Sequence, residues 1–248
     1  YKRQIFIFAV MILFSLLIHY LLKENKRKEL LFQTDPLTGG WNREGFLKQC
    51  REIIDNRTFK DYAIVYLNVI DFRIINESWG EEDGNRTLQF IFRQFEQHMQ
   101  KKGEMASRSS MDHFFLLMRE TNSDMISQRL SEVIQEMNEK IGEKFFGASL
   151  NFTIGVCYLD AADNLSSAMT RAISASKQKA DKNVCTFYDN AVAAKQEREQ
   201  RLNELFEESM VNRDLKIYLQ PKVSLTPGQP CEAEALVRWI HPKEGIIY

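Results

Sequence analysis

The segment SRSSMDHF, at residues 107–114, places two side chains that could contact a metal ion or a nucleotide next to each other. Asp112 offers carboxylate oxygens, which are the ligands that Mg²⁺ prefers, whereas the imidazole of His113 is a poor ligand for Mg²⁺. The segment follows a stretch with helical periodicity and leads into an apolar run, FFLLM (114–118). The pattern therefore predicts a turn at the start of a buried strand.

Composition limits the classes of function. The chain has 248 residues, which is enough for about two domains. Its net charge of -1 gives no reason to expect a nucleic-acid partner. The four cysteines lack CxxC spacing, which fits a reducing compartment better than a disulfide framework or a zinc site. Because the chain begins with Tyr and stops at Tyr248 inside a recognisable motif, we expect a fragment of a longer protein.

Residues 5–22, IFIFAVMILFSLLIHYLL, form one apolar run. At about 1.5 Å per residue, a helix of this length just crosses a bilayer. The basic flank is heavier at residues 23–28, which predicts that the rest of the chain is cytoplasmic. A cleaved signal peptide would need a shorter core and small residues near a cleavage site, and HYLLKENKRK (19–28) has neither. We therefore expect a single-pass anchor in the cytoplasmic (inner) membrane.

The middle of the chain alternates between strand and helix patterns. Residues 62–70 (YAIVYLNVI) are aromatic and β-branched, as in a buried strand. Residues 82–100 carry apolar side chains at helical spacing. The order of strands and helices predicts an α/β, or α+β, fold in which one sheet packs against helices. The expected helices are 42–56, 82–100, 124–141 and 165–180, and the expected strands are 62–70, 112–119, 149–159 and 184–188.

The last sixty residues have a different pattern. Residues 190–213 are rich in Glu, Arg and Gln with a thin apolar stripe, which predicts an exposed linker helix. Residues 215–220 and 231–237 are expected strands, joined through TPGQP (226–230) in a hairpin connection. The expected organisation is a membrane helix and linker at 1–34, a main domain at 35–190, a linker helix at 191–213, and the start of another domain at 214–248.

Three segments in the main domain resemble the GGDEF family of bacterial diguanylate cyclases. They are DPLTGGWNREGF (35–46), LNVIDFRIINESWGEEDGN (67–85) and NFTIGV (151–156). The signature turn of that family is Gly-Gly-Asp/Glu-Glu-Phe, and residues 110–114 here are Ser-Met-Asp-His-Phe. The resemblance implies the palm-like sheet of the nucleotide cyclases, flanked by helices.

The same resemblance implies that the metal site is degenerate. Condensing two GTP molecules needs divalent metal held by carboxylates, which the family takes from a strand and from the signature turn. The strand position is Asn68 here, whose amide oxygen is neutral, while Asp112 still fits the turn position. His113 replaces the following Glu, and Ser110 and Met111 put side chains where the family has glycines. We therefore do not expect cyclase activity.

For guanine recognition, the family uses an Asn and an Asp. Asn76 matches the first, and Asn85 replaces the second, so the acceptor-only carboxylate for two guanine N–H donors is gone. A late lysine that contacts phosphate is matched by Lys177 or by Lys182, and the spacing does not decide between them. The resemblance leaves GTP as a regulatory ligand of this pocket.

The family's product-inhibition motif, Arg-x-x-Asp, falls at KKGE (101–104). Lysine lacks the bidentate fork that suits a guanine edge or a phosphate, so feedback binding is not expected there. For these lysines the structural alternative, which we favour, is a solvated helix end.

The tail resembles the opening of an EAL domain, the cyclic di-GMP phosphodiesterase. The matching segments are YLQPKVSL (218–225), EALVRW (234–239) and HPKEG (241–245). The resemblance implies that Glu234 is a metal ligand, for Mg²⁺ or Mn²⁺, and that Gln220 and Arg238 contact the substrate. Carboxylate-held metal can activate water for attack on a phosphodiester, and an arginine can stabilise the charge. The structural alternative is a salt bridge between Glu234 and Arg238 at the mouth of a barrel, and we favour the functional interpretation. The other residues of such a site would lie beyond the chain's end.

The hypothesis is a membrane-anchored cyclic di-GMP signalling protein. Its degenerate GGDEF domain regulates an EAL phosphodiesterase, and its partners are cyclic di-GMP, GTP, the membrane and a second copy paired through the segment before Asp35. One alternative is a catalytically inactive receptor or scaffold for cyclic dinucleotides. A second alternative is an active diguanylate cyclase, which Asn68, Met111 and His113 disfavour.

Overall fold

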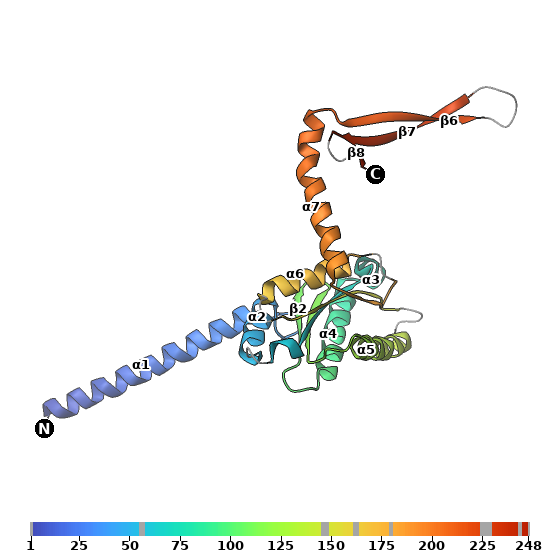
Figure 1. Cartoon of the computed structure of the whole chain (residues 1–248). Coiled ribbons are helices and arrows are strands. Elements are labelled where there is room, and N and C mark those ends of the chain that lie inside the picture. The colour runs from blue at the N-terminus through green and yellow to red at the C-terminus, as the bar shows by residue number, and fades with distance from the viewer. Residues whose placement is uncertain are drawn as a thin grey trace. The chain divides into compact units, whose positions relative to one another are not determined.

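The computed structural model of the chain divides into two compact units, Tyr1–Asp189 and Asn190–Tyr248 (Figure 1). The structure describes residues 2–54, 58–144, 149–160, 164–178, 181–223, 230–242 and 245–247.

The first unit begins with a long helix, α1 (Lys2–Gln33), which contains the apolar run 5–22. Among the helices of the described residues, none combines the length and the apolarity that crossing a bilayer requires. α1 stops just before Asp35-Pro36, as the restriction on a residue that precedes proline predicts. The Asn42 side chain then donates to the Phe32 carbonyl oxygen at 2.7 Å, which fixes the chain where it leaves α1.

Five strands form the sheet of this unit, in the order β2-β3-β1-β4-β5. The central strand β1 pairs antiparallel with β3 on one side and with β4 on the other. β2 pairs antiparallel with β3, and the short β5 pairs parallel with β4. The strands are β1 (Ala63–Val69), β2 (Met105–Ser110), β3 (His113–Met118), β4 (Phe152–Tyr158) and β5 (Cys185–Phe187).

Helices cover both faces of this sheet, which explains why β1 is apolar along almost its whole length. Val65 and Leu67 point to the face that is covered by α4 and α5, whereas Ile64 and Tyr66 point to the face that is covered by α2 and α6. Gly155 in β4 lets α6 lie close, because an added Cβ would be 1.9 Å from the Ala172 carbonyl oxygen. The helices are α2 (Arg43–Ile53), α3 (Phe72–Trp79), α4 (Glu81–His98), α5 (Ser123–Lys144) and α6 (Leu165–Ser176), with a short 3₁₀ turn at Phe59–Asp61.

The predicted class, a sheet against helices, is confirmed, but the expected order of elements missed two of them. β2 has the sequence MASRSS, which is polar and has no apolar alternation, because it forms one edge of the sheet. α3 has only eight residues, and it is separated from α4 by Gly80, whose φ is 87°. A positive φ favours glycine, and here it separates α3 from α4. A helical period of 3.6 residues in the sequence does not show this break.

The second unit contains α7 (Asn190–Val211) and a three-stranded antiparallel sheet in the order β6-β7-β8. Its strands are β6 (Leu215–Val223), β7 (Pro230–His241) and β8 (Gly245–Ile247). β6 and β7 pair as the expected hairpin, while β8 was not expected. The strands described in this unit do not close a barrel, so the start of an EAL barrel is not confirmed.

Candidate degenerate nucleotide site

The signature turn lies at the tip of the β2–β3 hairpin, where Ser110 pairs with His113. Met111 occupies the tip with a left-handed backbone (φ 48°), and it is 72% exposed. A side chain in that conformation costs about 1 kcal/mol, which a glycine would avoid. The turn therefore keeps a backbone suited to glycine while it carries a large side chain.

Arg108 holds this turn against the segment that follows α1. Its guanidinium donates from Nη1 to Asp35 Oδ2 at 2.8 Å and from Nε to the Met111 carbonyl oxygen at 2.8 Å. Asp35 also accepts from the Thr38 backbone and hydroxyl, at 2.9 and 2.8 Å. Both charged side chains of the Arg108–Asp35 pair are largely buried. The sequence analysis assigned no role to Arg108. The one feature that could have indicated a role is that Arg108 is the single charged residue of the polar strand β2.

The structure brings Asn68, Asp112 and His113 together at one end of the sheet. Asn68 is the β1 partner of His113, and the Asp112 carbonyl oxygen accepts from the Val69 backbone at 3.3 Å. The His113 Nε2 lies 3.7 Å from Asp112 Oδ1, and its ring meets Tyr66 edge-on at 5.6 Å. Burial, and then the charge of Asp112, raises the pKa of Tyr66 to about 12.

This donor set does not fit a magnesium centre for GTP condensation. It offers one carboxylate, one neutral amide and one imidazole, whereas Mg²⁺ bound to triphosphate prefers oxygen anions. Across the described residues, no three His, Cys, Asp or Glu side chains come together in a way that could hold a metal ion.

Asn76 and Asn85, the candidate guanine contacts, lie on the adjacent helices α3 and α4, and both are half-buried. The Asn76 amide lies against Gly84, because a Cβ on that glycine would be 1.8 Å from Asn76 Oδ1. Glycine at position 84 therefore makes room for the Asn76 side chain. Both candidates are amides, which offer a donor as well as an acceptor, where a carboxylate would only accept.

The two candidate phosphate lysines lie at different places. Lys177 is the exposed C-terminal cap of α6. Lys182 lies in the turn before β5 and lines a cavity of about 190 Å³ together with Asp71 and Ile74. Asn183 anchors this turn, because its Oδ1 accepts from the Phe152 backbone at 2.8 Å. Lys182 is thus the lysine that shares a cavity with the start of α3.

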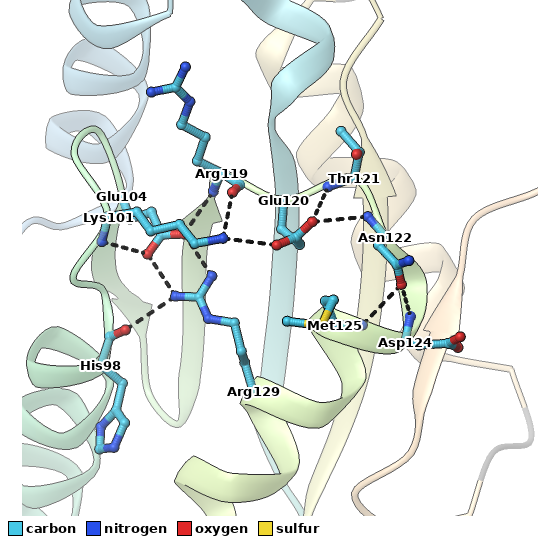
Figure 2. A network of polar contacts seen from close by, with 10 residues as sticks. All are labelled: His98, Lys101, Glu104, Arg119, Glu120, Thr121, Asn122, Asp124, Met125 and Arg129. Carbon is cyan, nitrogen blue, oxygen red and sulfur yellow. Dashed lines mark hydrogen bonds and ion pairs between the residues drawn. The ribbon is translucent and has the colours of Figure 1, made fainter.

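The lysines of the KKGE segment are exposed, as the favoured alternative of a solvated helix end predicts, but the side chain of Glu104 in the same segment is buried. Figure 2 shows the Glu104 carboxylate facing the Arg129 guanidinium of α5, with two bonds of 2.7 Å. The Glu104 side chain has no exposed surface, and that of Arg129 is 18% exposed. Glu104 also accepts from the backbone of Lys101 at 3.2 Å and of Arg119 at 3.0 Å. A buried ion pair here was invisible to pattern reasoning, because Arg129 is 25 residues away along the chain.

A second ion pair continues this network toward the start of α5. Lys101 Nζ lies 2.9 Å from Glu120 Oε2, and Glu120 accepts from the backbone of Thr121 and Asn122 at 3.0 and 3.2 Å. The Lys101 hydrogen bond is the main cause that lowers the pKa of Glu120 to about 2. The hydrogen bonding that Arg129 donates to Glu104 raises the pKa of Arg129. Lys101 and Arg129 are therefore both paired with carboxylates of the same domain.

In the second unit, the three candidate residues of the tail share one face of the β6–β7 hairpin. Gln220 lies directly opposite Glu234, and Arg238 follows four residues later on the same strand. Cross-strand partners, and residues an even number apart, point to the same face of a sheet. Lys222 Nζ lies 3.8 Å from Glu234 Oε2, and both side chains are exposed.

The chain is similar to known proteins of cyclic di-GMP signalling. It is 24% identical over 221 residues to the cyclic di-GMP phosphodiesterase NbdA of Pseudomonas aeruginosa, an alignment that covers 86% of this chain and 28% of NbdA. The chain thus spans less than a third of that relative.

Two solved structures have a similar fold. One contains the coiled coil and GGDEF domain of DgcB from Caulobacter crescentus in complex with c-di-GMP (TM-score 0.59, 17% identity, 70% of this chain and 94% of that one). The other is Vibrio cholerae LapD S helix-GGDEF-EAL bound to c-di-GMP (TM-score 0.58, 16% identity, 93% of this chain and 54% of that one). Residues 32–183, well over half of the chain, match the family described as diguanylate cyclase, GGDEF domain. The chain belongs to the GGDEF family.

Proposed function

We propose that this GGDEF domain makes no cyclic di-GMP and instead regulates a cyclic di-GMP phosphodiesterase that begins in the second unit. The observation that carries this proposal is the end of the sheet beside the signature turn, where the neutral Asn68 faces His113 and Asp112 supplies a carboxylate next to that imidazole. Such a site cannot neutralise two triphosphates with oxygen-bound metal. A domain that keeps its fold after losing this chemistry retains binding and signalling as its roles.

GTP is the regulatory ligand that we propose for the domain. Support comes from Asn76 and Asn85, which lie half-buried on adjacent helices, with Gly84 leaving room for the first amide. Lys177 or Lys182 would contact phosphate. With a neutral amide in place of a carboxylate at position 85, we expect weaker binding than a guanine–carboxylate pair gives, because hydrogen bonds to a charged acceptor are about twice as strong.

The phosphodiesterase role is proposed for the protein extended beyond this chain. Gln220, Glu234 and Arg238 lie on one face of the β6–β7 hairpin, as substrate and metal contacts of one site would need to. NbdA, the relative described above, carries the name of a cyclic di-GMP phosphodiesterase. In the proposed site, Glu234 would hold Mg²⁺ or Mn²⁺, which supplies an activated water, while Arg238 would bind a phosphate oxygen and Gln220 would orient the substrate.

We also propose a single-pass anchor at residues 5–22 in the cytoplasmic membrane, with both domains in the cytoplasm. A second copy would pair through α1. The apolar side chains of α1 that the structure describes, such as Leu13, Phe14 and Leu16, are exposed and could be covered by lipid or by a second helix.

The first test uses the purified chain with radiolabelled GTP and either Mg²⁺ or Mn²⁺. We expect no cyclic di-GMP, while calorimetry detects GTP binding that is weakened at least tenfold by Asn76→Ala. Glu82→Gln, an exposed change on α4, is the control and should bind as the parent does. Formation of cyclic di-GMP from GTP would overturn the proposal in favour of an active cyclase.

The second test measures turnover of cyclic di-GMP by the protein that carries the complete phosphodiesterase domain. We expect the linear dinucleotide as product, and we expect its loss in Glu234→Gln. Tight binding of cyclic di-GMP without turnover under either metal would favour the alternative, a receptor or scaffold.

A further inference from the structure

The last turns of α7 pack against the end of β7 within the second unit. The Phe206 ring meets the Trp239 ring edge-on, with centroids 5.7 Å apart and an angle of 80° between the planes. Ser209 lies three residues after Phe206, on the same side of the helix, and it is almost fully buried. This contact fixes one position of the linker helix against one position of the strand.

Trp239 lies on the face of the sheet opposite to Glu234 and Arg238. Adjacent residues of a strand point to opposite faces, so Trp239 and Arg238 diverge, whereas Arg238 and Glu234 share a face. α7 therefore contacts the back of the strand whose front carries the proposed metal ligand and the proposed phosphate contact.

Backbone hydrogen bonds make this joint short and direct. The Asp214 N–H donates to the Ser209 carbonyl oxygen at 2.9 Å, and the Ile240 N–H donates to the Asp214 carbonyl oxygen at 2.8 Å. Leu215, the first residue of β6, pairs with Trp239. One residue, Asp214, thus connects the end of α7 to β7, so the helix end and the strand cannot shift independently without breaking these bonds.

The packing between α7 and β7 also leaves two buried polar atoms, of the residues that the structure describes, without a hydrogen-bond partner. Among the described side chains, Ser209 Oγ and Trp239 Nε1 are the buried polar atoms that have no hydrogen-bond partner. Burial of an unpaired polar atom is unfavourable, so the packing of the rings must offset it. By contrast, Ile217, Leu219 and Val237 farther along the apolar face are exposed, so the described packing of α7 is confined to one end of the hairpin.

We propose that Phe206 and Trp239 are positioning residues that set the placement of Glu234 and Arg238. A movement of the linker helix then reaches the proposed phosphodiesterase site through this joint. The inference rests on the proposed function, because it assigns these residues a role in that site's regulation. A displacement of about 1 Å at a reacting centre can lower a rate by a factor of about 100, so a small shift of β7 is enough.

The first test measures the joint itself in the whole chain. Trp41 and Trp79 are changed to Phe so that Trp239 is the only fluorophore of its kind, and Phe206→Ala is then introduced. Val211→Ala, on the same helix and 83% exposed, is the matched control. We expect Phe206→Ala to shift the Trp239 emission to longer wavelength and to speed hydrogen exchange of the β7 amides at least tenfold. If Phe206→Ala behaves as Val211→Ala in both measurements, the joint is refuted.

The second test measures positioning in the protein with the complete phosphodiesterase domain. We expect Phe206→Ala to lower kcat for cyclic di-GMP at least tenfold with a smaller change in KM, and Phe206→Tyr to restore it. If the parent protein shows no turnover, the proposed phosphodiesterase function fails. The effect of Phe206→Ala on the placement of Glu234 and Arg238 is then measured through the affinity for cyclic di-GMP. Unchanged kcat, KM and affinity in a variant whose β7 exchanges faster would overturn the positioning role while leaving the proposed function intact.

Discussion

The buried ion pair between Glu104 and Arg129 gives the sharpest test of the structure. Glu104→Gln removes the negative charge and leaves one oxygen where the carboxylate accepts from Arg129 twice and from two backbone N–H groups. The new amide group must point a donor toward other donors. The variant therefore leaves a largely buried guanidinium without its counter-charge.

The expected loss follows from the burial of both partners. Breaking a buried ion pair by removing one partner costs about 3–5 kcal/mol. The Arg129 side chain is 18% exposed and still donates to the His98 carbonyl oxygen, so the expected loss is about 3 kcal/mol. For a domain of this size, that corresponds to a fall in Tm of about 6–12 °C.

The assay is urea unfolding of the chain followed by circular dichroism, with thermal melts alongside. Glu82→Gln serves as the control, because its ion pair with Arg86 is exposed and should contribute at most about 0.5 kcal/mol. Replacing both Glu104 and Arg129 by Met should recover part of the loss, since apolar side chains of similar volume leave no buried charge, although the backbone N–H groups of Lys101 and Arg119 lose their acceptor. A Glu104→Gln variant no less stable than Glu82→Gln would refute the reasoning.

Three further predictions concern single side chains. The folded-state pKa of Glu120 lies below its unfolded value, so its contribution to stability is present above about pH 4.5 and is lost as pH falls toward about 2. Glu120→Gln should therefore flatten that part of a curve of unfolding free energy against pH. An unchanged slope would contradict the pairing with Lys101. Met111→Gly should leave the free energy of unfolding unchanged or raise it by up to about 1 kcal/mol in urea titrations, because glycine adopts the left-handed backbone freely. A clear loss of stability would mean that the turn is not left-handed. Ser209→Ala should be neutral or stabilising by about 1 kcal/mol, because it removes a buried hydroxyl without a partner, and a loss above about 1 kcal/mol by the same titration would show that the hydroxyl is bonded.

Local patterns were enough to predict the layered fold. The apolar run of β1 and the apolar face of α5 (Ile126, Leu130, Val133 and others) follow from the periods of strand and helix, and these residues form the core. β2 escaped prediction because its edge position removes the need for apolar alternation. α3 escaped because eight residues give too few turns for a helical period to be seen.

The candidate site was predicted in part. Asn68, Asp112 and His113 were expected near one another from the resemblance, and the structure places them at one end of β1 and β3. The pair of Arg108 and Asp35 was not foreseen, because 73 residues separate the two and a single sequence holds no signal for such contacts. For the same reason, the resemblance located KKGE but did not predict that Glu120 pairs with Lys101 or that Arg129 pairs with Glu104.

The closed network around Glu104 also bears on the control of the domain. A phosphate ester that approaches Lys101 or Arg129 has to displace carboxylates that are tethered beside them, at an effective concentration in the millimolar range or above. Lys101 and Arg129 are therefore less available to an anionic ligand than two unpaired basic side chains would be.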